Sequence, residues 1–535
     1  MGNSNKLDKK SKTLDITDIG SFSTDPWANA QKAPESILDT LAYPDLKGME
    51  VMLINPNCYY RKKLLGLGLA YIATALKRCN INVTVMDCSA WAHDDIEIAR
   101  ILVESKVKIF GIGGMYPNFR EVERLCGLIR AVVPGATIIL GGALPTPIPE
   151  FVLKQTGADI CALGEAEMTI PQLMRALAET KNLEDVSGIA YIKDGEFFHN
   201  GDPQLPTRVT KREVGWPALD LFPMEHYFQS AKFYPFSQSD RPVPIVTGRG
   251  CPYSCNFCYR VSAYRFRPVG ELMDEIEYLI DRFKVNAFYF VDDLFMLSQQ
   301  KMKDFCEAII NRGLKIKYNC SGRVNTINPE IARLMKESGC ISVYYGLESG
   351  NQEILNNMSK KTSLEQIYEA VRLTREQGIY CMYGFIFGEP NDNEQTMNDT
   401  VECIKKISYG EYRAQKIFGC VPFPGSGLYD WCKQSGRIKD DKDFHDRYIC
   451  QDWSLDQIPV NMTQMSDEKL RQVFKKANDS LNSFYLEKMS TDWVEYFSGK
   501  KETPKIASEN QKTMQHLSTR IESDMNTYDI SGRTD

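Results

Sequence analysis

Apolar runs typical of strands alternate with segments of helical spacing in residues 47–180. The predicted helices of this part include 67–78 and 119–132. The predicted strands are 51–54, 83–86, 109–113, 137–140 and 159–162. Strands that alternate with helices join through right-handed crossovers into a parallel sheet. We therefore predict an α/β unit with a doubly wound, Rossmann-like parallel sheet.

The same alternation returns in residues 243–425, where about six strand–helix units follow one another. Two of the predicted helices are 272–283 and 364–377. The predicted strands are 244–247, 287–291, 316–320, 342–345, 380–387 and 415–421. Polar residues gather after the carboxyl ends of these strands, at the rim that carries the chemistry in barrel-like α/β folds. Six units predict a partial (β/α)6 barrel.

The remaining parts of the chain lack this alternation. Residues 1–46 are polar and contain three prolines, so we expect a flexible N-terminal arm. Residues 181–242 are expected to form a linker with one small hairpin that turns at Asp194 and Gly195. Residues 426–535 predict a mainly helical C-terminal region that ends in a polar tail.

Composition limits the class of protein and its location. Hydrophobic residues make up 43% and charged residues 25%, with a net charge of −6, so no global attraction to nucleic acid or anionic membranes is expected. No apolar stretch approaches the ~18 residues of a transmembrane segment. The first ten residues lack the apolar core of a secretory signal. Sixteen cysteines without such a signal predict a reducing, cytoplasmic location, where thiols stay free to bind metal.

Three cysteines within one short segment, Cys251, Cys255 and Cys258, indicate metal chemistry. Four cysteine ligands would saturate a cubane iron–sulfur cluster, whereas three leave one iron open for a substrate or cofactor. A structural zinc site needs a fourth Cys or His. No histidine lies between His226 and His445, so zinc would require a distant ligand. The triplet therefore favours a cluster with one open iron.

Glycines follow the carboxyl ends of the third, fourth and fifth predicted strands of the N-terminal sheet. Ligands of open α/β sheets bind beyond this edge, and glycine lets the backbone approach a flat ligand closely. Tight turns alone would explain any single glycine, but three consecutive strand ends favour a binding site. The candidate binding residues are Asn55, Gly113, Gly114, Gly141, Gly142, Gly164 and Glu165.

The cysteine spacing, with Phe257 before the last cysteine, resembles that of the radical S-adenosylmethionine (SAM) enzymes. This resemblance implies a 4Fe-4S cluster whose open iron binds the amino and carboxylate groups of SAM, which is then cleaved to a 5′-deoxyadenosyl radical. It also places four residues at the SAM site: Tyr259, Asp293, Arg323 and Glu348. Asp292 or Asp293 could instead cap the following helix. Arg249 could tune the charge of the cluster or pair with an acid.

Residues 47–180 resemble the cobalamin-binding domain that often precedes such a barrel. The stretches that carry this resemblance are 65–73, 83–87, 139–143 and 163–167. It implies cobalamin as a second cofactor, bound by the glycine-rich edge. Many such domains ligate cobalt through the histidine of an Asp-x-His-x-x-Gly motif. No histidine of this chain stands in that motif, and Asp443-Phe-His445, which comes nearest, lies in the C-terminal region.

The chain thus resembles the cobalamin-binding radical SAM enzyme family, in which methylation of an unactivated carbon is the commonest outcome. Radical cyclisation, hydroxylation or rearrangement without methyl transfer is the alternative. A tRNA methylthiotransferase would need a second, N-terminal cysteine triad, which the sequence does not show clearly. An electron carrier would normally close its cluster with a fourth cysteine. We expect an oxygen-sensitive enzyme with a small-molecule or lipid substrate and a reducing partner such as flavodoxin or ferredoxin, and no nucleic acid.

Overall fold

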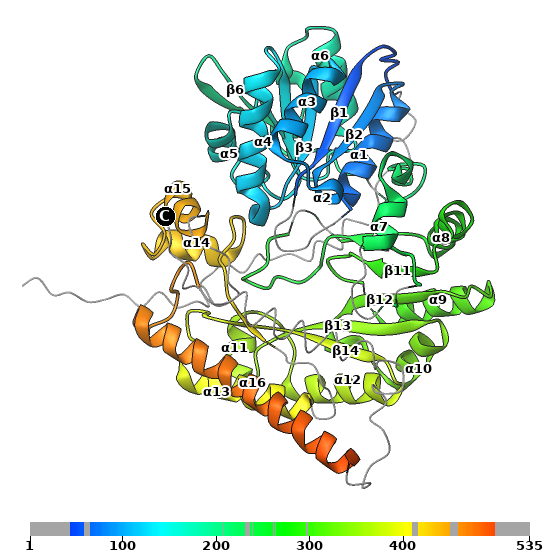
Figure 1. Cartoon of the computed structure of the whole chain (residues 1–535). Helices are drawn as coiled ribbons and strands as arrows, with labels where there is room; N and C mark the ends of the chain where they lie inside the picture. The colour runs from blue at the N-terminus through cyan, green and yellow to red at the C-terminus, as the bar shows by residue number, and fades with distance from the viewer. Residues whose placement is uncertain are drawn as a thin grey trace, which may run out of the picture.

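The computed structural model describes residues 43–57, 65–206, 208–230, 236–237, 239–260, 262, 264–295, 298–408, 416–449 and 458–497. The predicted N-terminal arm up to residue 42 and the tail from residue 498 lie outside them. An N-terminal α/β domain sits above an open barrel, and C-terminal helices contact both (Figure 1). No described helix has the length and apolar character needed to cross a membrane.

The N-terminal sheet confirms all five predicted strands and adds the predicted hairpin. Its strands are β1 (Glu50–Asn55), β2 (Asn82–Asp87), β3 (Ile109–Gly113), β4 (Thr137–Gly141), β5 (Ile160–Ala162), β6 (Ile189–Lys193) and β7 (Glu196–His199). The order is β2-β1-β3-β4-β5-β6-β7, with the first five strands parallel. The hairpin β6–β7 joins antiparallel to β5. Asp194 and Gly195 have φ of 53° and 84°, as its tight turn requires.

Helices cover both faces of this sheet, as a doubly wound fold requires. They are α1 (Leu67–Arg78), α2 (Cys88–Trp91), α3 (Asp95–Ser105), α4 (Phe119–Val132), α5 (Pro149–Thr156) and α6 (Thr169–Ala178). Helix α1 contacts α6, while α4 contacts both α3 and α5. Because side chains alternate along a strand, Leu53 of β1 packs with Leu76 of α1, and the neighbouring Ile54 belongs to the core beneath α3 and α4.

The barrel sheet contains six parallel strands in the order β15-β14-β13-β12-β11-β8. They are β8 (Pro242–Ile245), β11 (Ala287–Phe290), β12 (Lys317–Gly322), β13 (Cys340–Glu348), β14 (Tyr380–Phe387) and β15 (Ile417–Gly419). Strands β8 and β15 do not pair with each other, so the barrel is partial, as predicted. The cysteine loop follows β8 and is framed by a small ribbon of β9 (Gly248–Arg249) and β10 (Arg265–Phe266).

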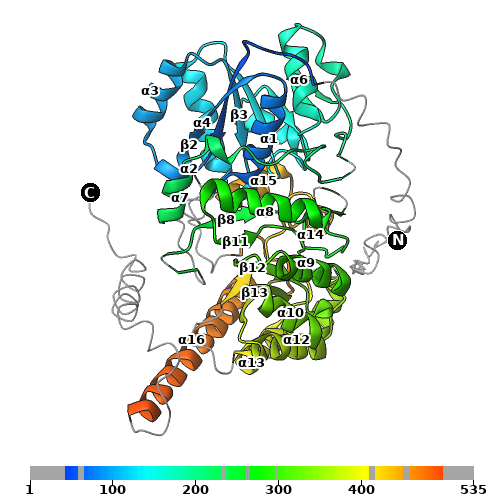
Figure 2. The ribbon, with the colours of Figure 1, turned by 90° about the vertical axis from the view of Figure 1, so that its right-hand side faces the viewer.

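Helices cover the outer side of the barrel sheet (Figure 2). They are α8 (Val269–Phe283), α9 (Gln299–Asn311), α10 (Pro329–Glu337), α11 (Gln352–Asn357), α12 (Leu364–Glu376) and α13 (Glu394–Ile407). Helix α7 (Met224–Ser230) lies in the connection between the two domains.

The C-terminal region is mainly helical, as predicted, but it divides between the two domains. Helix α16 (Asp467–Phe497) runs along α13, and Phe474 stacks on Phe387 of β14. Helices α14 (Gly427–Gln434) and α15 (Asp441–Ile449) instead reach the N-terminal domain (Figure 1). There, Phe444 and Tyr448 pack their rings 5.3 and 5.1 Å from the ring of Tyr116.

Candidate functional site

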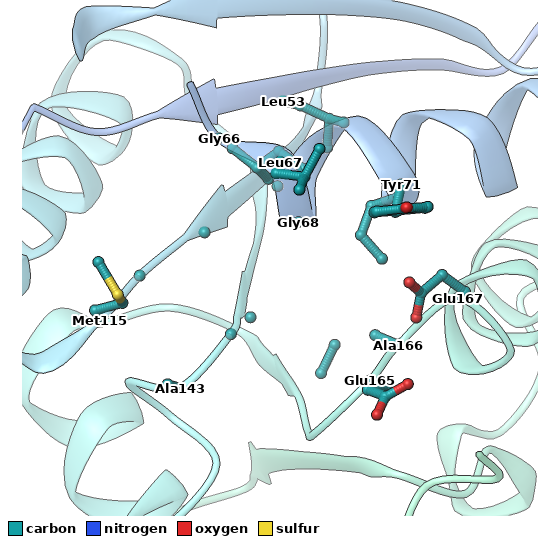
Figure 3. A pocket seen from close by; sticks show the side chains of 18 of the residues that line it. Leu53, Gly66, Leu67, Gly68, Tyr71, Met115, Ala143, Glu165, Ala166 and Glu167 are labelled. Carbon is teal, nitrogen blue, oxygen red and sulfur yellow. The ribbon is translucent and has the colours of Figure 1, made fainter. Parts of the chain in front are cut away.

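One cavity of about 610 Å³ opens at the carboxyl edge of the N-terminal sheet (Figure 3). All seven residues predicted at this edge line it: Asn55, Gly113, Gly114, Gly141, Gly142, Gly164 and Glu165. Its inner end is lined by apolar residues of the sheet, α1 and α6, such as Leu53, Leu76 and Met174. Its opposite wall belongs to the barrel and includes Arg249 and Asp293. The two domains therefore share one cavity.

Two glycines show that part of the cavity wall has no room for side chains. A Cβ on Gly142, whose φ is +88°, would lie 2.7 Å from the carbonyl oxygen of Gly114. A Cβ on Gly66 would lie 2.7 Å from Oδ1 of Asn55. The Asn55 amide is itself fixed, because its Nδ2 donates to Asp87 at 2.9 Å. Bare backbone and an apolar interior fit a large planar cofactor.

An ion-pair network links this cavity to the cysteine loop. The Arg249 guanidinium contacts the carboxylates of Glu165 at 2.7 Å and Glu167 at 2.6 Å, and it lies over the ring of Tyr71. Arg265 contacts Glu165 as well. Burial alone would raise the pKa of Glu165. The positive charges of Arg249 and Arg265 have the larger combined effect, so the pKa of Glu165 is lowered. Of the two roles considered for Arg249, the structure shows pairing with acids (Figure 3 shows both glutamates and Tyr71).

The backbone before the cysteine loop is anchored by Asp292. Its Oδ1 accepts hydrogen bonds from the Thr247 amide and hydroxyl, both at 2.8 Å, and from the Gly248 amide at 2.6 Å. Burial raises the pKa of Asp292 to about 7, although these hydrogen bonds oppose the shift. Asp292 therefore has a structural role, but it fixes the loop rather than capping a helix. The adjacent Asp293 lines the cavity, and burial raises its pKa too.

The three loop cysteines face a common region. Burial raises the pKa of Cys251, and it raises that of Cys258 to about 12; the charge on Cys255 adds to both shifts. Among the described residues, no three His, Cys, Asp or Glu side chains surround the position of a single ion. The three thiols lie in one loop. Their mutual proximity in one loop fits a cluster, whose irons each take one thiolate.

Backbone carbonyls of residues 357–360, which we name the cradle, hold the cysteine loop. The Asn256 amide donates to the Met358 carbonyl at 3.2 Å, and its side chain donates to the Asn357 carbonyl at 3.1 Å. The Cys255 thiol lies 3.9 Å from the carbonyl oxygen of Ser359. Ser359 has a φ of +55°, a strained value for a side chain-bearing residue that such contacts can maintain. The loop also has a partner in α14: the Leu428 amide, at the start of this helix, donates a hydrogen bond to the Asn256 carbonyl.

Arg323 and Glu348 flank this loop. Nη1 of Arg323 lies 3.9 Å from the sulfur of Cys255, its guanidinium covers the ring of Tyr253 at 3.7 Å, and it donates to the Lys360 carbonyl. Glu348 has a φ of +65° next to a bulge in β13. Its carboxylate contacts Nζ of Lys360 at 2.6 Å, and both side chains are buried. We did not predict Lys360, because a lysine in a polar Ser-Lys-Lys-Thr segment has the pattern of a solvated surface residue.

Tyr259 and His445 make contacts with the C-terminal region or the N-terminal domain. The Tyr259 ring packs on Gly425, where a Cβ would come within 2.4 Å of it, and burial raises its pKa to about 12. A hydrogen bond with Thr146 connects Tyr259 to the N-terminal domain. His445 packs 4.4 Å from the ring of Phe119 and does not line the cavity. The structure therefore gives His445 no contact with the glycine-rich edge.

Comparisons with known proteins agree with this arrangement. Residues 61–174 match the B12 binding domain family, and residues 245–404 match the Radical SAM superfamily. An uncharacterized methyltransferase of Pyrococcus horikoshii is 27% identical over 72% of this chain and 83% of its own length. The hopanoid C-3 methylase of Methylococcus capsulatus is 25% identical over 71% of each chain. The anaerobic magnesium-protoporphyrin IX monomethyl ester cyclase of Synechocystis is 26% identical over 68% and 72%.

Solved structures share the fold. The radical SAM methyltransferase TsrM from Kitasatospora setae, solved with cobalamin and a 4Fe-4S cluster, superposes with a TM-score of 0.59 at 19% identity. That match covers 72% of this chain and 75% of TsrM. The cobalamin-dependent SAM radical enzyme OxsB, solved with aqua-cobalamin, gives a TM-score of 0.58 at 22% identity. That match covers 75% of this chain and 56% of OxsB.

Proposed function

Because the chain belongs to the cobalamin-binding radical SAM enzyme family, we propose that it methylates an unactivated carbon of a small-molecule or lipid substrate. The reaction begins with cleavage of SAM at a 4Fe-4S cluster. The observation that carries the proposal is the shared cavity, in which the glycine-rich edge of the N-terminal sheet faces the segments that flank the cysteine loop. One space thus adjoins both predicted cofactor sites.

The residues present fit the three groups that this reaction needs. Cys251, Cys255 and Cys258 would hold the cluster, and the glycine-rich edge would hold cobalamin. Asp293, Arg323, Glu348 and Tyr259 are proposed to bind SAM, and the first three of them lie around the cysteine loop. When bound, the cofactors supply the deoxyadenosyl radical and the methyl group.

The protein itself positions the cofactors and excludes water from the site. The cradle fixes the loop and Asp292 fixes the backbone just before it, while the apolar cavity wall keeps solvent from reactive species. The network around Arg249 holds the two domains at a fixed separation. We include in the proposal a cytoplasmic location and a reducing partner such as flavodoxin or ferredoxin.

A radical outcome without methyl transfer is the second candidate. It is favoured by the similarity to the anaerobic magnesium-protoporphyrin IX monomethyl ester cyclase. Both outcomes begin with the same radical. A tRNA methylthiotransferase ranks below them, since the sequence does not show a clear second cysteine triad.

The test is anaerobic reconstitution of the full chain with iron, sulfide and hydroxocobalamin. We expect about four irons per chain and a cobalamin spectrum. With reductant, we expect 5′-deoxyadenosine together with S-adenosylhomocysteine. Deoxyadenosine alone would instead support the second candidate. Cys255→Ala should abolish the cluster, whereas Cys126→Ala, a buried thiol of α4, should retain it. A cluster that survives Cys255→Ala would overturn the proposal.

A further inference from the structure

The two faces of the barrel sheet differ in what covers them. On the outer face, the hydroxyl groups of Tyr345 (β13) and Thr374 (α12) share a hydrogen bond of 2.8 Å. On the same face, Phe290 of β11 packs on Phe305 of α9. The alternate positions therefore point to the inner side of the barrel. There, Val291 and Tyr344 are 46% and 43% exposed, and Val291 also lines the shared cavity. The inner face is open toward the cofactor sites.

The inner face carries neutral side chains. Ser321, Tyr344 and Met382 stand side by side in register on β12, β13 and β14. Gly346 and Gly384 pair above them, and the Tyr344 hydroxyl lies over Gly384, so close that a Cβ there would come within 2.2 Å of it. The central row thus carries one thioether and two hydroxyls, from Ser321 and Tyr344, next to bare backbone at Gly346 and Gly384. The Glu348–Lys360 ion pair lies beside Gly346.

Charged residues on the six barrel strands are confined to their ends. The six described strands contain two of them, Lys317 at the start of β12 and Glu348 at the end of β13. Lys317 pairs with Asp240 at 2.9 Å, and Glu348 pairs with Lys360 at 2.6 Å. Both charges are thus neutralised within the protein, and the strand residues between them offer no counter-charge to a ligand.

Two arginines at the mouth of the barrel are paired with acids, and two further charged residues there, Asp293 and Arg323, are those proposed to bind SAM. Arg249 is held by Glu165 and Glu167, and Arg265 is held by Glu165. A charged substrate group that entered this space would lose its hydration without gaining an ion pair from these side chains. Burying an ion without such compensation is strongly unfavourable. The electrostatics of the described residues therefore select against charged groups.

We propose that the part of the substrate that enters the inner face of the barrel is uncharged and apolar, of the hydrocarbon or aromatic class. Ser321 and Asn319, both on β12, can hydrogen-bond a neutral hydroxyl or carbonyl group of that part. Phosphorylated, nucleotide-like and amino acid substrates are excluded from this position. The inference rests on the proposed function, since it concerns the carbon from which the radical would abstract hydrogen.

The binding test uses Nile red, a neutral apolar dye, with the cobalamin-loaded, cluster-containing chain. We expect a blue-shifted fluorescence increase that is lost in Met382→Asp, which places a charge on the inner face. Val103→Asp, on the exposed side of α3, should leave the signal unchanged. Iron content and the cobalamin spectrum show whether each variant is folded. Nile red binding that Met382→Asp does not weaken would overturn the inference.

The substrate test uses the chloroform-soluble and water-soluble fractions of an extract from the native organism. We expect the chloroform-soluble fraction to stimulate 5′-deoxyadenosine formation at least several-fold, and Met382→Asp to lose that stimulation. Stimulation by the water-soluble fraction alone would overturn the inference while leaving the proposed function intact. If neither fraction stimulates, the dye experiment decides. Dye binding without any SAM cleavage would refute the proposed function but not the apolar character of the inner face.

Discussion

Arg249, two residues before the first cysteine of the loop, forms a 2.6 Å ion pair with Glu167 of the N-terminal domain. Both side chains are largely buried, so the contact is protected from solvent and salt. It joins the N-terminal domain to the segment that leads into the loop of the proposed cluster ligands. The ion pair thus helps to set the distance between the two proposed cofactor sites.

Removal of Glu167 should loosen this connection. Glu167→Ala is expected to destabilise the protein by about 1.5–3 kcal/mol, the value of a hydrogen bond to a charged group, since Arg249 keeps Glu165. Chemical denaturation measures the change. The control is Asp220→Ala, which breaks the exposed pair with Lys77 and should cost under about 1 kcal/mol. Equal effects of the two variants would contradict a special role for the network.

Lys360→Met should make the cluster harder to reduce. The Lys360 ammonium lies close enough to lower the pKa of Cys258, and a positive charge stabilises the more negative, reduced cluster. Loss of the Lys360 ammonium also leaves the Glu348 carboxylate without its ion-pair partner. A redox titration followed by electron paramagnetic resonance should show a lower midpoint potential. Lys361→Met, next to it but exposed, should leave the potential unchanged.

Gly142→Ala should weaken cobalamin binding. The added Cβ would lie 2.7 Å from the Gly114 carbonyl oxygen and force the cavity wall to move. Gly135→Ala is the matched control, because Gly135 has a similar φ of +74° but no heavy atom within 4 Å of the added Cβ. Both variants should lose about 1–3 kcal/mol from backbone strain. A visible-light titration should show at least tenfold weaker binding for Gly142→Ala alone.

Glu389 should make the protein less stable as the pH rises. Burial raises its pKa to about 8, and nearby Asp392 and Glu353 add to the shift. The folded state therefore holds a proton that the unfolded chain releases near its ordinary pKa. Between these two pKa values stability falls with pH, by up to about 1.4 kcal/mol per unit.

Glu389→Gln removes this ionisation while keeping the shape of the side chain. The melting temperature of the wild type should fall relative to that of Glu389→Gln between pH 5 and pH 8. The difference should level off above pH 8, where the carboxyl group is ionised in both states. Parallel melting curves across that range would contradict the prediction, because they would show that Glu389 ionises alike in the folded and unfolded states.

Local sequence patterns predicted much of the fold. The spacing of Leu69, Ala73 and Leu76 gave α1 with its correct ends, because both amphipathic period and burial are local properties. The boundaries of β13 were predicted less well: 342–345 became Cys340–Glu348, since pairing with both β12 and β14 extends the strand. Such pairing depends on neighbours that are distant in sequence.

The site was predictable where residues follow strands, and less so elsewhere. Asp293 and Arg323 follow strand ends, which parallel topology brings to one rim. Lys360 could not be predicted, because its partner Glu348 reaches it only through the fold of the intervening helix α11. Likewise, no sequence pattern connects Arg249 with Glu165 and Glu167, which lie more than 80 positions earlier.

The hydrogen bond from Leu428 to Asn256 has a consequence for the order of assembly. The cysteine loop gains its last backbone partner from a helix that lies about 170 positions later in the chain. A ribosome-bound chain that has released the cysteines but not α14 would present that loop without this support. We therefore expect iron–sulfur insertion to be completed after synthesis, on the full-length protein.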